Sequence, residues 1–319
     1  MSLRIAVQMD PLERINIAGD STFAIMLRAQ ELGHDLYWYA PEDLSFAQGR
    51  LWTMGYPVKV QRVAGDHYSF GEPRILDLGQ DVDVVLMRQD PPFDLGYITA
   101  THLLERIQGE TLVVNDPAAV RNAPEKIWVL DFPEFMPPTA ITRSLGLARK
   151  FLADHGEIVI KPLHGFAGGS VFRIGADGRN LASLMELFNR TYREPHVIQK
   201  FLPEIAQGDK RIVLVDGEVA GAVNRVPGEG EIRSNLAVGG KGQKAVLTER
   251  EQEICATLGP ELKTRGLLFV GIDVIGGQWL TEINVTSPTG IVAIDQFNGT
   301  DTPALIWQAI ERRLASTGR

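Results

Sequence analysis

The chain has 319 residues, and its 32 Lys and Arg against 40 Asp and Glu give a formal net charge of −8. This balance excludes a broadly basic nucleic-acid-binding protein, which needs positive charge to displace counterions from phosphates. Hydrophobic residues make up 44%, enough to bury a core, and the single cysteine excludes an internal disulfide framework. We predict an acidic, globular protein of about two to three domain-sized units.

The apolar segments of the chain are short. None approaches the roughly 18 consecutive apolar residues that suggest a membrane-spanning helix. The first residues reach a charge at Arg4 and another at Asp10, which leaves no apolar core for a signal peptide. We therefore expect a protein of the reducing cytoplasm with no membrane partner.

Strands and helices alternate over about the first 120 residues. Strands separated by helices indicate a parallel sheet with helices on its faces, and ligands bind such sheets at the carboxyl ends of the strands. The expected strands are 3–8, 36–40, 82–87 and 112–115, and the expected helices are 21–31 and 96–107.

The rest of the chain has a different pattern, with hairpins joined by short glycine turns. The expected strands are 157–162, 171–174, 196–202, 210–215, 218–223, 269–275 and 278–285, and the expected helices are 125–130, 181–190, 248–265 and 302–314. The segment 227–244 is too long for an ordinary connection and suggests a mobile lid.

Two carboxylates and an amide lie on the last expected hairpin. Asp273 is on one strand, while Glu282 and Asn284 are two apart on its partner and share one face. Together they offer the hard oxygen ligands that Mg²⁺ prefers, with Mn²⁺ as an alternative ion. The competing interpretation is a solvated strand edge, but apolar neighbours make unpaired burial of these acids costly. The hairpin therefore predicts a divalent-cation site.

A glycine-dense turn at 165–170 follows the strand that ends near Lys161. Glycines let backbone N–H groups approach phosphate oxygens, and a lysine supplies a point charge. The sequence lacks both GxxxxGK[ST] and GxGxxG, so neither a Walker P-loop nor a dinucleotide fingerprint is present. A plain hairpin turn is the alternative, but Lys126, Lys161 and Arg211 favour a polyphosphate site.

One acid and several arginines complete the candidate residues. Asp209 could accept hydrogen bonds from a ribose or hold a lysine, and Arg211 projects from the same strand; a structural salt bridge is the alternative. Arg225 and Arg233 flank the long loop and suit the stabilisation of oxyanion charge, unless they are solvated loop charges. Arg88 follows a strand and could pair with a substrate carboxylate or form an interdomain salt bridge.

Seven segments, taken in order, resemble the ATP-grasp superfamily and, within it, the bacterial glutathione synthetases. They are MDPLERINIAGDSTFAIMLRAQELGH (9–34), LMRQDPPFD (86–94), VNDPAAVRNAPEK (114–126), IVIKPLHGFAGGS (158–170), GDKRIVLVDGE (208–218), EIRSNLAVGGKG (231–242) and FVGIDVIGGQWLTEINVTSPTG (269–290). The set runs nearly end to end and is specific as a whole, whereas any one segment supports only ATP-grasp.

The resemblance implies α/β and α+β architecture of the ATP-grasp type: an N-terminal parallel-sheet domain (1–122), a small lid subdomain (123–205) and a C-terminal domain (206–319). ATP would lie between the last two. The implied ATP-binding residues are Lys126, Lys161, Gly165, Gly168, Gly169, Ser170, Gln199, Lys200, Phe201, Leu202 and Asp209. The implied Mg²⁺ ligands are Asp273, Glu282 and Asn284, and Arg211 is implied to contact phosphate. We expect Arg211, Arg225 and Arg233 to be catalytic, and the expected peptide-substrate contacts are Arg88, Asp90, Ser287, Thr289 and Gly290.

The resemblance also implies the reaction. Enzymes of this family join γ-L-glutamyl-L-cysteine to glycine with ATP as co-substrate, through an acyl phosphate, and a homo-oligomer is implied. One alternative is an ATP-grasp ligase for other substrates, such as a D-alanine pair or another amino acid. Another is a non-catalytic, synapsin-like ATP-binding regulatory protein, against which the intact metal trio argues. Two residues depart from the family: Ala167 replaces a frequent glycine, and His164 replaces a common acidic residue.

Overall fold

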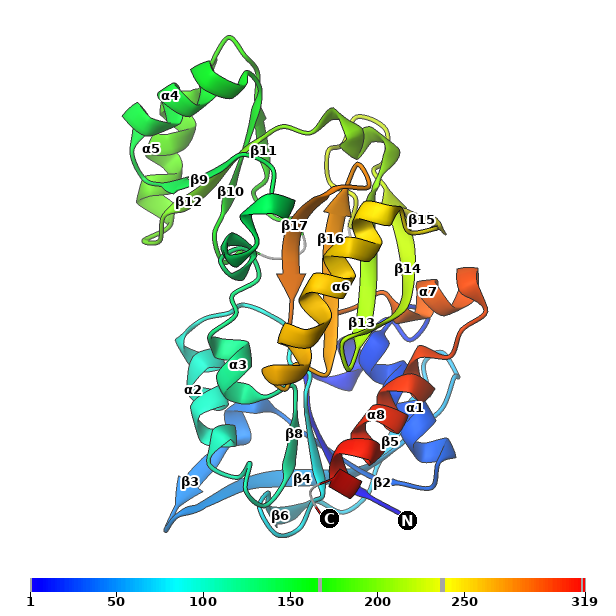
Figure 1. The fold of residues 1–319 in the computed structure, drawn as a ribbon. Coiled ribbons are helices and arrows are strands. Elements are labelled where there is room, and N and C mark those ends of the chain that lie inside the picture. Colours follow the sequence, from blue (N-terminus) through cyan, green and yellow to red (C-terminus); the bar gives the residue numbers. More distant parts are fainter. Residues whose placement is uncertain (1, 166–167, 236–238, 317, 319) are drawn as a thin grey trace.

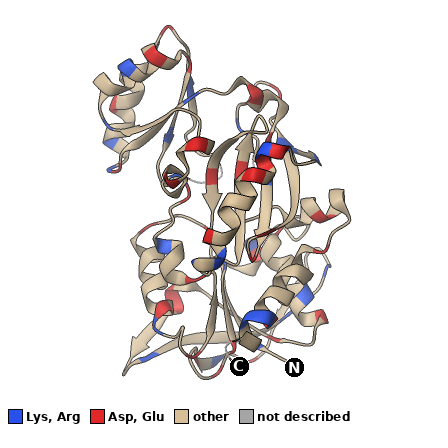
Figure 2. Ribbon diagram, in the orientation of Figure 1, with Lys and Arg blue, Asp and Glu red and all other residues tan. Residues whose placement is uncertain are grey.

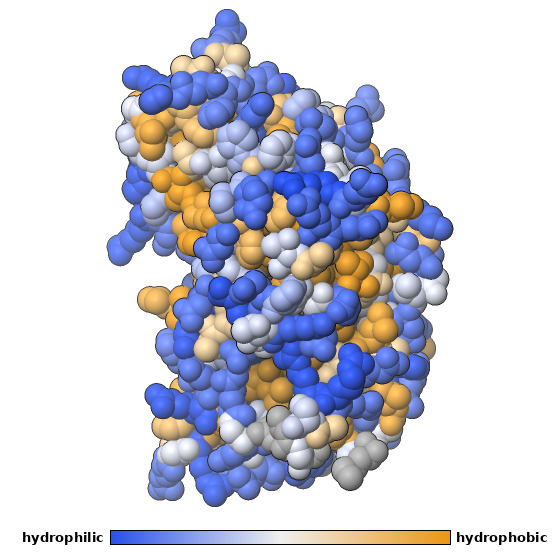
Figure 3. Space-filling view, in the orientation of Figure 1, coloured by the Kyte–Doolittle hydropathy of each residue, from blue (hydrophilic) through white to orange (hydrophobic). Residues whose placement is uncertain are grey.

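The computed structural model describes residues 2–165, 168–235, 239–316 and 318. Three β-sheets follow one another along the chain, and helices cover them (Figure 1). Acidic and basic residues are interspersed along the ribbon (Figure 2), and the face in Figure 3 is mostly hydrophilic with separate apolar patches. Within the described ranges, no helix is long and apolar enough to cross a membrane.

The N-terminal sheet contains the predicted parallel strands. In spatial order these are β2 (Asp35–Tyr39), β1 (Arg4–Gln8), β7 (Val84–Met87) and β8 (Leu112–Val114). Helices α1 (Ser21–Glu31), α2 (Leu95–Glu105) and α3 (Pro117–Arg121) belong to this part. Asp20 caps α1 by accepting a hydrogen bond from the Phe23 N–H at 2.6 Å, which explains why that helix begins where the sequence predicts.

An antiparallel extension of this sheet was not predicted. The long strand β4 (Arg50–Val60) pairs with β2, and it also pairs with β3 (Ser45–Ala47), β5 (Tyr68–Phe70) and β6 (Arg74–Asp77). Its burial alternates imperfectly, and Gly55 and Pro57 interrupt the run. These breakers conceal the strand from a reading based on periodicity.

The central sheet is antiparallel, in the order β11 (Phe172–Ile174), β10 (Ile158–Pro162), β12 (His196–Lys200) and β9 (Thr139–Thr142). Helices α4 (Leu145–His155) and α5 (Leu181–Thr191) pack on it through a separate apolar core. The predicted hairpin of β10 and β11 is confirmed.

The predicted helix over 125–130 is wrong. The residues there form turns that lead into a short 3₁₀ helix at Trp128–Asp131. The carbonyl of Glu125 accepts a hydrogen bond from the N–H of Ile283 at 3.0 Å, so this backbone is bound to the C-terminal sheet instead of to a following helical turn. Lys126 is thereby fixed beside that sheet.

The C-terminal sheet has the order β15 (Lys241–Lys244), β14 (Glu218–Val226), β13 (Asp209–Val215), β16 (Phe269–Ile275) and β17 (Trp279–Asn284). Both predicted hairpins are confirmed, with neighbouring strands antiparallel. The end of the predicted loop 227–244 forms β15, because residues 241–244 pair with the exposed edge of β14. The connection is therefore shorter than expected.

Helix α6 (Glu249–Thr264) crosses one face of this sheet, and the helices α7 (Ile291–Asn298) and α8 (Thr302–Ser316) follow it in the chain (Figure 1). Helix α8 packs beside α1, where the Trp307 Nε1 donates to the carbonyl of Ile25 at 2.9 Å. One apolar core is therefore shared between the first and last parts of the chain.

Asn115 joins the N-terminal and C-terminal sheets. Its Nδ2 donates to the carbonyls of Phe269 at 2.7 Å and Val285 at 2.8 Å, and its Oδ1 accepts from the Phe269 N–H. All these groups are buried. The hairpin that carries the candidate metal ligands is thus held against the N-terminal sheet.

Candidate active site

A cavity of about 620 Å³ is lined by residues of the central and C-terminal sheets, of the segments between them and of loops of the N-terminal part. Most of the predicted site residues line it; those that do are Asp90, Lys126, Lys161, Gly165, Gly168, Gly169, Gln199, Lys200, Phe201, Leu202, Asp209, Arg211, Arg225, Arg233, Asp273, Glu282, Asn284, Ser287, Thr289 and Gly290. Arg88 and Ser170 lie outside its lining. One continuous space therefore brings together residues that are far apart in the chain.

One end of the cavity is apolar. Phe201 and Leu202 line it, as predicted, together with Val159, Ile205 and Ile275, which sequence reasoning missed. The Arg173 guanidinium lies 4.0 Å from the centre of the Phe201 ring and supports its outer face. Such a slot suits a flat, apolar group.

The metal trio converges as predicted. Asp273 on β16 lies opposite Glu282 on β17, and the Asn284 Nδ2 approaches Asp273 Oδ2 at 3.4 Å. β17 is an edge strand, but its polar side chains face the cavity, so the solvated-edge alternative is wrong. Oxygen atoms of two carboxylates and one amide are chemically suited to a hard divalent cation.

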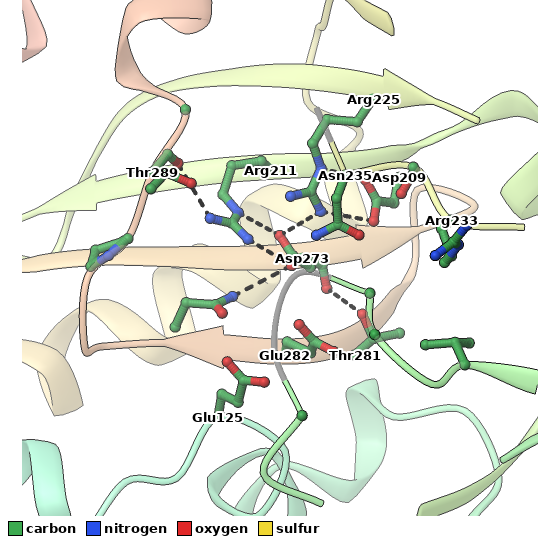
Figure 4. Close-up of a pocket in the computed structure, with 18 of the residues that line it drawn as sticks. Glu125, Asp209, Arg211, Arg225, Arg233, Asn235, Asp273, Thr281, Glu282 and Thr289 are labelled. Atoms are coloured by element: carbon green, nitrogen blue, oxygen red, sulfur yellow. Dashed lines mark hydrogen bonds and ion pairs between the residues drawn. The ribbon is translucent and has the colours of Figure 1, made fainter. Parts of the chain in front are cut away.

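Asp273 is bound by two arginines in this structure (Figure 4). Arg211, its register partner on β13, donates through Nε at 2.6 Å and Nη2 at 2.9 Å, and Arg225 Nη2 lies 3.0 Å from Oδ1. Burial alone would raise the pKa of Asp273, but these two guanidiniums outweigh it and hold the pKa well below its ordinary value. Asp273 is therefore ionised at neutral pH.

Asp209 is engaged by Arg225. The arginine donates to both carboxylate oxygens, at 2.7 and 2.8 Å, across the neighbouring strands β13 and β14. The alternative of a structural salt bridge therefore holds for both residues in this structure: Asp209 pairs with Arg225, and Arg211 pairs with Asp273. Arg225 is a buried strand residue and not a solvated loop charge. Arg233 is partly exposed and pairs with Glu231 in its own loop.

Two lysines face the metal trio. Lys126 Nζ and Lys161 Nζ each lie 3.4 Å from Glu282 Oε1, and they hold the pKa of Glu282 below its usual range although burial opposes this. Lys126 also donates to the carbonyl of Gly165 at 2.7 Å and pairs with Glu125. Glu125 is a partly buried cavity residue that sequence reasoning missed; its place beside Lys126 was the signal available.

The glycine turn and the long loop touch at the mouth of the cavity. A Cβ on Gly168, whose φ is +72°, would meet the Asn235 Oδ1 at 3.0 Å and the Arg233 Cδ at 3.4 Å. This close approach requires glycine. Ala167, which departs from the family pattern, lies outside the described residues, and the ring of His164 lies 5.9 Å from that of Phe93.

Arg88 does not form the interdomain salt bridge considered above, within the described residues. It is buried behind the cavity wall, where Nε donates to Thr22 Oγ1 at 3.0 Å and Nη2 to the carbonyl of Pro288 at 2.9 Å. Among the described residues, no carboxylate forms an ion pair with it, and its buried Nη1 has no hydrogen-bond partner. Arg88 thus bridges α1 and the segment before α7 while placing a positive charge under the wall.

The three sheets, with a cavity lined by opposed lysines, arginines and carboxylates, are typical of the ATP-grasp class. Solved structures share the fold: D-cycloserine synthetase has a TM-score of 0.69 at 17% identity, with 97% of this chain and 99% of the other covered. D-alanyl-alanine synthetase A from Vibrio cholerae has a TM-score of 0.61 at 13% identity, over 98% and 99%. At these identities the likeness concerns the fold alone.

The sequence comparisons are more specific. Residues 3–121 match the N-terminal domain of prokaryotic glutathione synthetase, and residues 125–299 match its ATP-grasp domain. A glutathione synthetase of Rhodopseudomonas palustris is 57% identical over 99% of this chain and its own full length, and one of Yersinia pestis is 42% identical over 98% of each. The chain belongs to the prokaryotic glutathione synthetase family.

Proposed function

We propose that this protein joins γ-L-glutamyl-L-cysteine to glycine, consuming ATP and releasing glutathione, ADP and phosphate. The observation that carries the proposal is the end-to-end identity with relatives named glutathione synthetase, which includes the N-terminal part as well as the ATP-grasp part. The chemistry of the cavity supports it. ATP as a co-substrate fits a cytoplasmic location, and the homo-oligomer implied by the family resemblance is part of the proposal.

ATP would lie between the central and C-terminal sheets. The adenine would occupy the apolar slot formed by Val159, Phe201 and Leu202, with the backbone of residues 199–202 along its edge. Lys126 and Lys161 would contact the phosphates, and the backbone of the turn 165–170 would cover them. Asp209 would lie on the nucleotide side of the cavity and act through Arg225, which donates hydrogen bonds to both carboxylate oxygens of Asp209.

Asp273, Glu282 and Asn284 would hold Mg²⁺, or Mn²⁺ as an alternative. The donor set fits, since it consists of two carboxylates and an amide oxygen on adjacent strands. When bound, such an ion neutralises phosphate charge during phosphoryl transfer. The protein itself fixes these ligands on a rigid hairpin, which Asn115 ties to the N-terminal sheet.

The reaction needs an activated carboxylate, because a free carboxylate is a poor electrophile. The cysteinyl carboxylate attacks the γ-phosphorus of ATP, ADP leaves, and an acyl phosphate forms. The amine of glycine, after losing a proton, attacks the carbonyl carbon, and phosphate leaves with the electrons of the C–O bond. Arg211 would contact phosphate, Arg225 and Arg233 would stabilise the oxyanion, and the loop that carries Arg233 would exclude water.

The peptide substrate would enter from the N-terminal side. Asp90, Ser287, Thr289 and Gly290 line that end of the cavity and are the proposed contacts. Arg88 would act from behind the wall by holding the carbonyl of Pro288 and supplying positive charge near the substrate carboxylates. This arrangement would leave the cysteinyl carboxylate free to face the phosphates.

The test follows ADP release from Mg-ATP with γ-glutamylcysteine and glycine together and with each omitted. A D-alanine pair and free glutamate serve as alternative substrates. We expect ADP only when both glutathione precursors are present, with glutathione formed in equal amount. Turnover with another pair alone would keep the fold and discard this substrate, and nucleotide binding without any turnover would favour a regulatory protein.

A further inference from the structure

The carboxylates that would bind a metal are already paired with cations of the chain itself. Both oxygens of Asp273 accept from the fork of Arg211, and Glu282 Oε1 lies 3.4 Å from the Nζ atoms of Lys126 and Lys161. Over the part of the chain that the structure describes, no three Asp, Glu, His or Cys side chains are grouped to hold a metal by themselves. The ligands are present, but other positive charges hold them.

The charges at the centre of the cavity balance. The side chains, none more than 22% exposed, are the acids Glu125, Asp209, Asp273 and Glu282 and the bases Lys126, Lys161, Arg211 and Arg225. A divalent cation alone would add positive charge to this buried group, and a polyphosphate alone would add negative charge. Either addition is unfavourable where solvent cannot compensate, and each partner offsets part of the charge that the other brings.

We propose that Arg211, Lys126 and Lys161 are counterions that occupy the metal ligands until nucleotide arrives, so that metal and nucleotide each bind more tightly in the presence of the other. On loading, Glu282 exchanges the two lysines for the cation while the lysines turn to phosphate oxygens. Asp273 likewise exchanges one of its two contacts with Arg211 for the cation. This inference rests on the metal ligands and nucleotide site proposed above, but not on the identity of the peptide substrate.

The proposal is tested by binding alone, without turnover. Free Mn²⁺ is titrated into the full-length protein and followed by its electron paramagnetic resonance signal, with and without a non-hydrolysable ATP analogue, and a protein-free titration corrects for Mn²⁺ bound by the analogue. Calorimetry then measures binding of the analogue with and without Mg²⁺. We expect each partner to raise the affinity of the other by about 10–100-fold, and by the same factor in both directions.

Variants identify the counterions. Arg211→Met removes one of the two arginines from Asp273, leaving Arg225, and Lys161→Met removes one of the two lysines from Glu282. Each is expected to raise the affinity for Mn²⁺ alone by about tenfold and to reduce the coupling to nucleotide. Arg233→Met is the matched control, since it removes a cavity arginine whose ion pair is with Glu231 and not with a metal ligand. Its affinity for Mn²⁺ alone should match the wild type.

Two results would overturn the proposal. One is tight binding of Mn²⁺ to the wild type without nucleotide; the other is unchanged or weaker Mn²⁺ binding in Lys161→Met and in Arg211→Met, with folding of each checked by thermal unfolding. Lys161→Met decides the matter if Arg211→Met fails to fold. Because no peptide substrate is present, coupling can hold even where glutathione is not formed, so the two proposals fail separately.

Discussion

Arg233 differs from the other two arginines assigned to catalysis. Arg211 and Arg225 are buried in ion pairs, whereas Arg233 is partly exposed on a loop and forms an ion pair with Glu231. A side chain so weakly held on a loop can follow the reacting groups when the loop moves. Arg233 is therefore suited to contact charge that develops during the reaction.

We expect Arg233→Ala to lower kcat by about 10²–10³-fold, the usual effect of removing an oxyanion donor, while leaving the Kd for ATP nearly unchanged. Steady-state kinetics and calorimetric titration of nucleotide measure the two quantities. Arg179→Ala serves as the control, because Arg179 is an exposed arginine distant from Arg233 in the sequence. Near-normal turnover in a folded Arg233→Ala protein would remove this role.

The ion pairs of Asp273 also contribute to the stability of the fold. Asp273→Asn keeps the shape but leaves the buried guanidiniums of Arg211 and Arg225 with less negative charge, so we expect the free energy of unfolding to fall by about 3–5 kcal/mol. Urea unfolding followed by tryptophan fluorescence measures it. Asp154→Asn, in an exposed pair with Lys150, should leave the stability nearly unchanged. Equal stabilities of the two variants would contradict the assignment.

At the scale of elements, the long loop depends on a close backbone contact. A Cβ on Gly240 would lie 2.0 Å from the carbonyl oxygen of Ser234 and 3.0 Å from that of Asn235, and neither atom can rotate away as a side chain could. Ser234 and Asn235 line the cavity. The fold of this loop is therefore set by the same contact that places its residues at the site.

Gly240→Ala should displace the loop and lower kcat while the unfolding transition of the core is kept, because the loop packs on the surface of the site and not in the sheets. Kinetics and limited proteolysis of the loop test this. Gly228→Ala is the matched control, since its added Cβ would meet only the Gly239 carbonyl at 3.9 Å. The prediction fails if the two variants turn over equally fast.

The sequence predicted most strands and helices but failed where pairing between distant segments decides the structure. Helix α6 was predicted, and in the structure a capping box of Thr248 and Glu251, which is a local signal, begins it. The segment at Lys126 was misassigned because the Glu125 carbonyl bonds to Ile283, far along the chain. β15 was missed for the same reason, since pairing with β14 decides it. Local capping can be predicted, whereas pairing between distant segments cannot.

The whole molecule should lose stability in mild acid. Burial lowers the pKa values of His34, His164 and His196, which lie in different parts of the fold. The unfolded chain therefore binds protons that the folded chain does not, so stability falls as pH drops below the unfolded value of about 6.5 and stops falling below the folded values. Above that range these histidines contribute no pH dependence.

Urea unfolding at several pH values between about 7.5 and 5.5 measures this dependence. His196→Gln should give a flatter profile than the wild type, because the buried ring that resists protonation is gone. A profile that is flat in the wild type, or that rises toward acid, would refute the sign of the effect.

The sequence alone determined which segments become strands and helices where capping and apolar runs are local, and which residue types could bind phosphate or metal. Only the tertiary structure decided which charges meet: Arg211 lies 62 positions from Asp273 and Lys161 lies 121 from Glu282. Burial of Arg88 without an acid partner and the entry of Glu125 into the cavity were decided there too. The physical reason is that ion pairing and desolvation depend on the register and packing of distant strands, which local sequence does not encode.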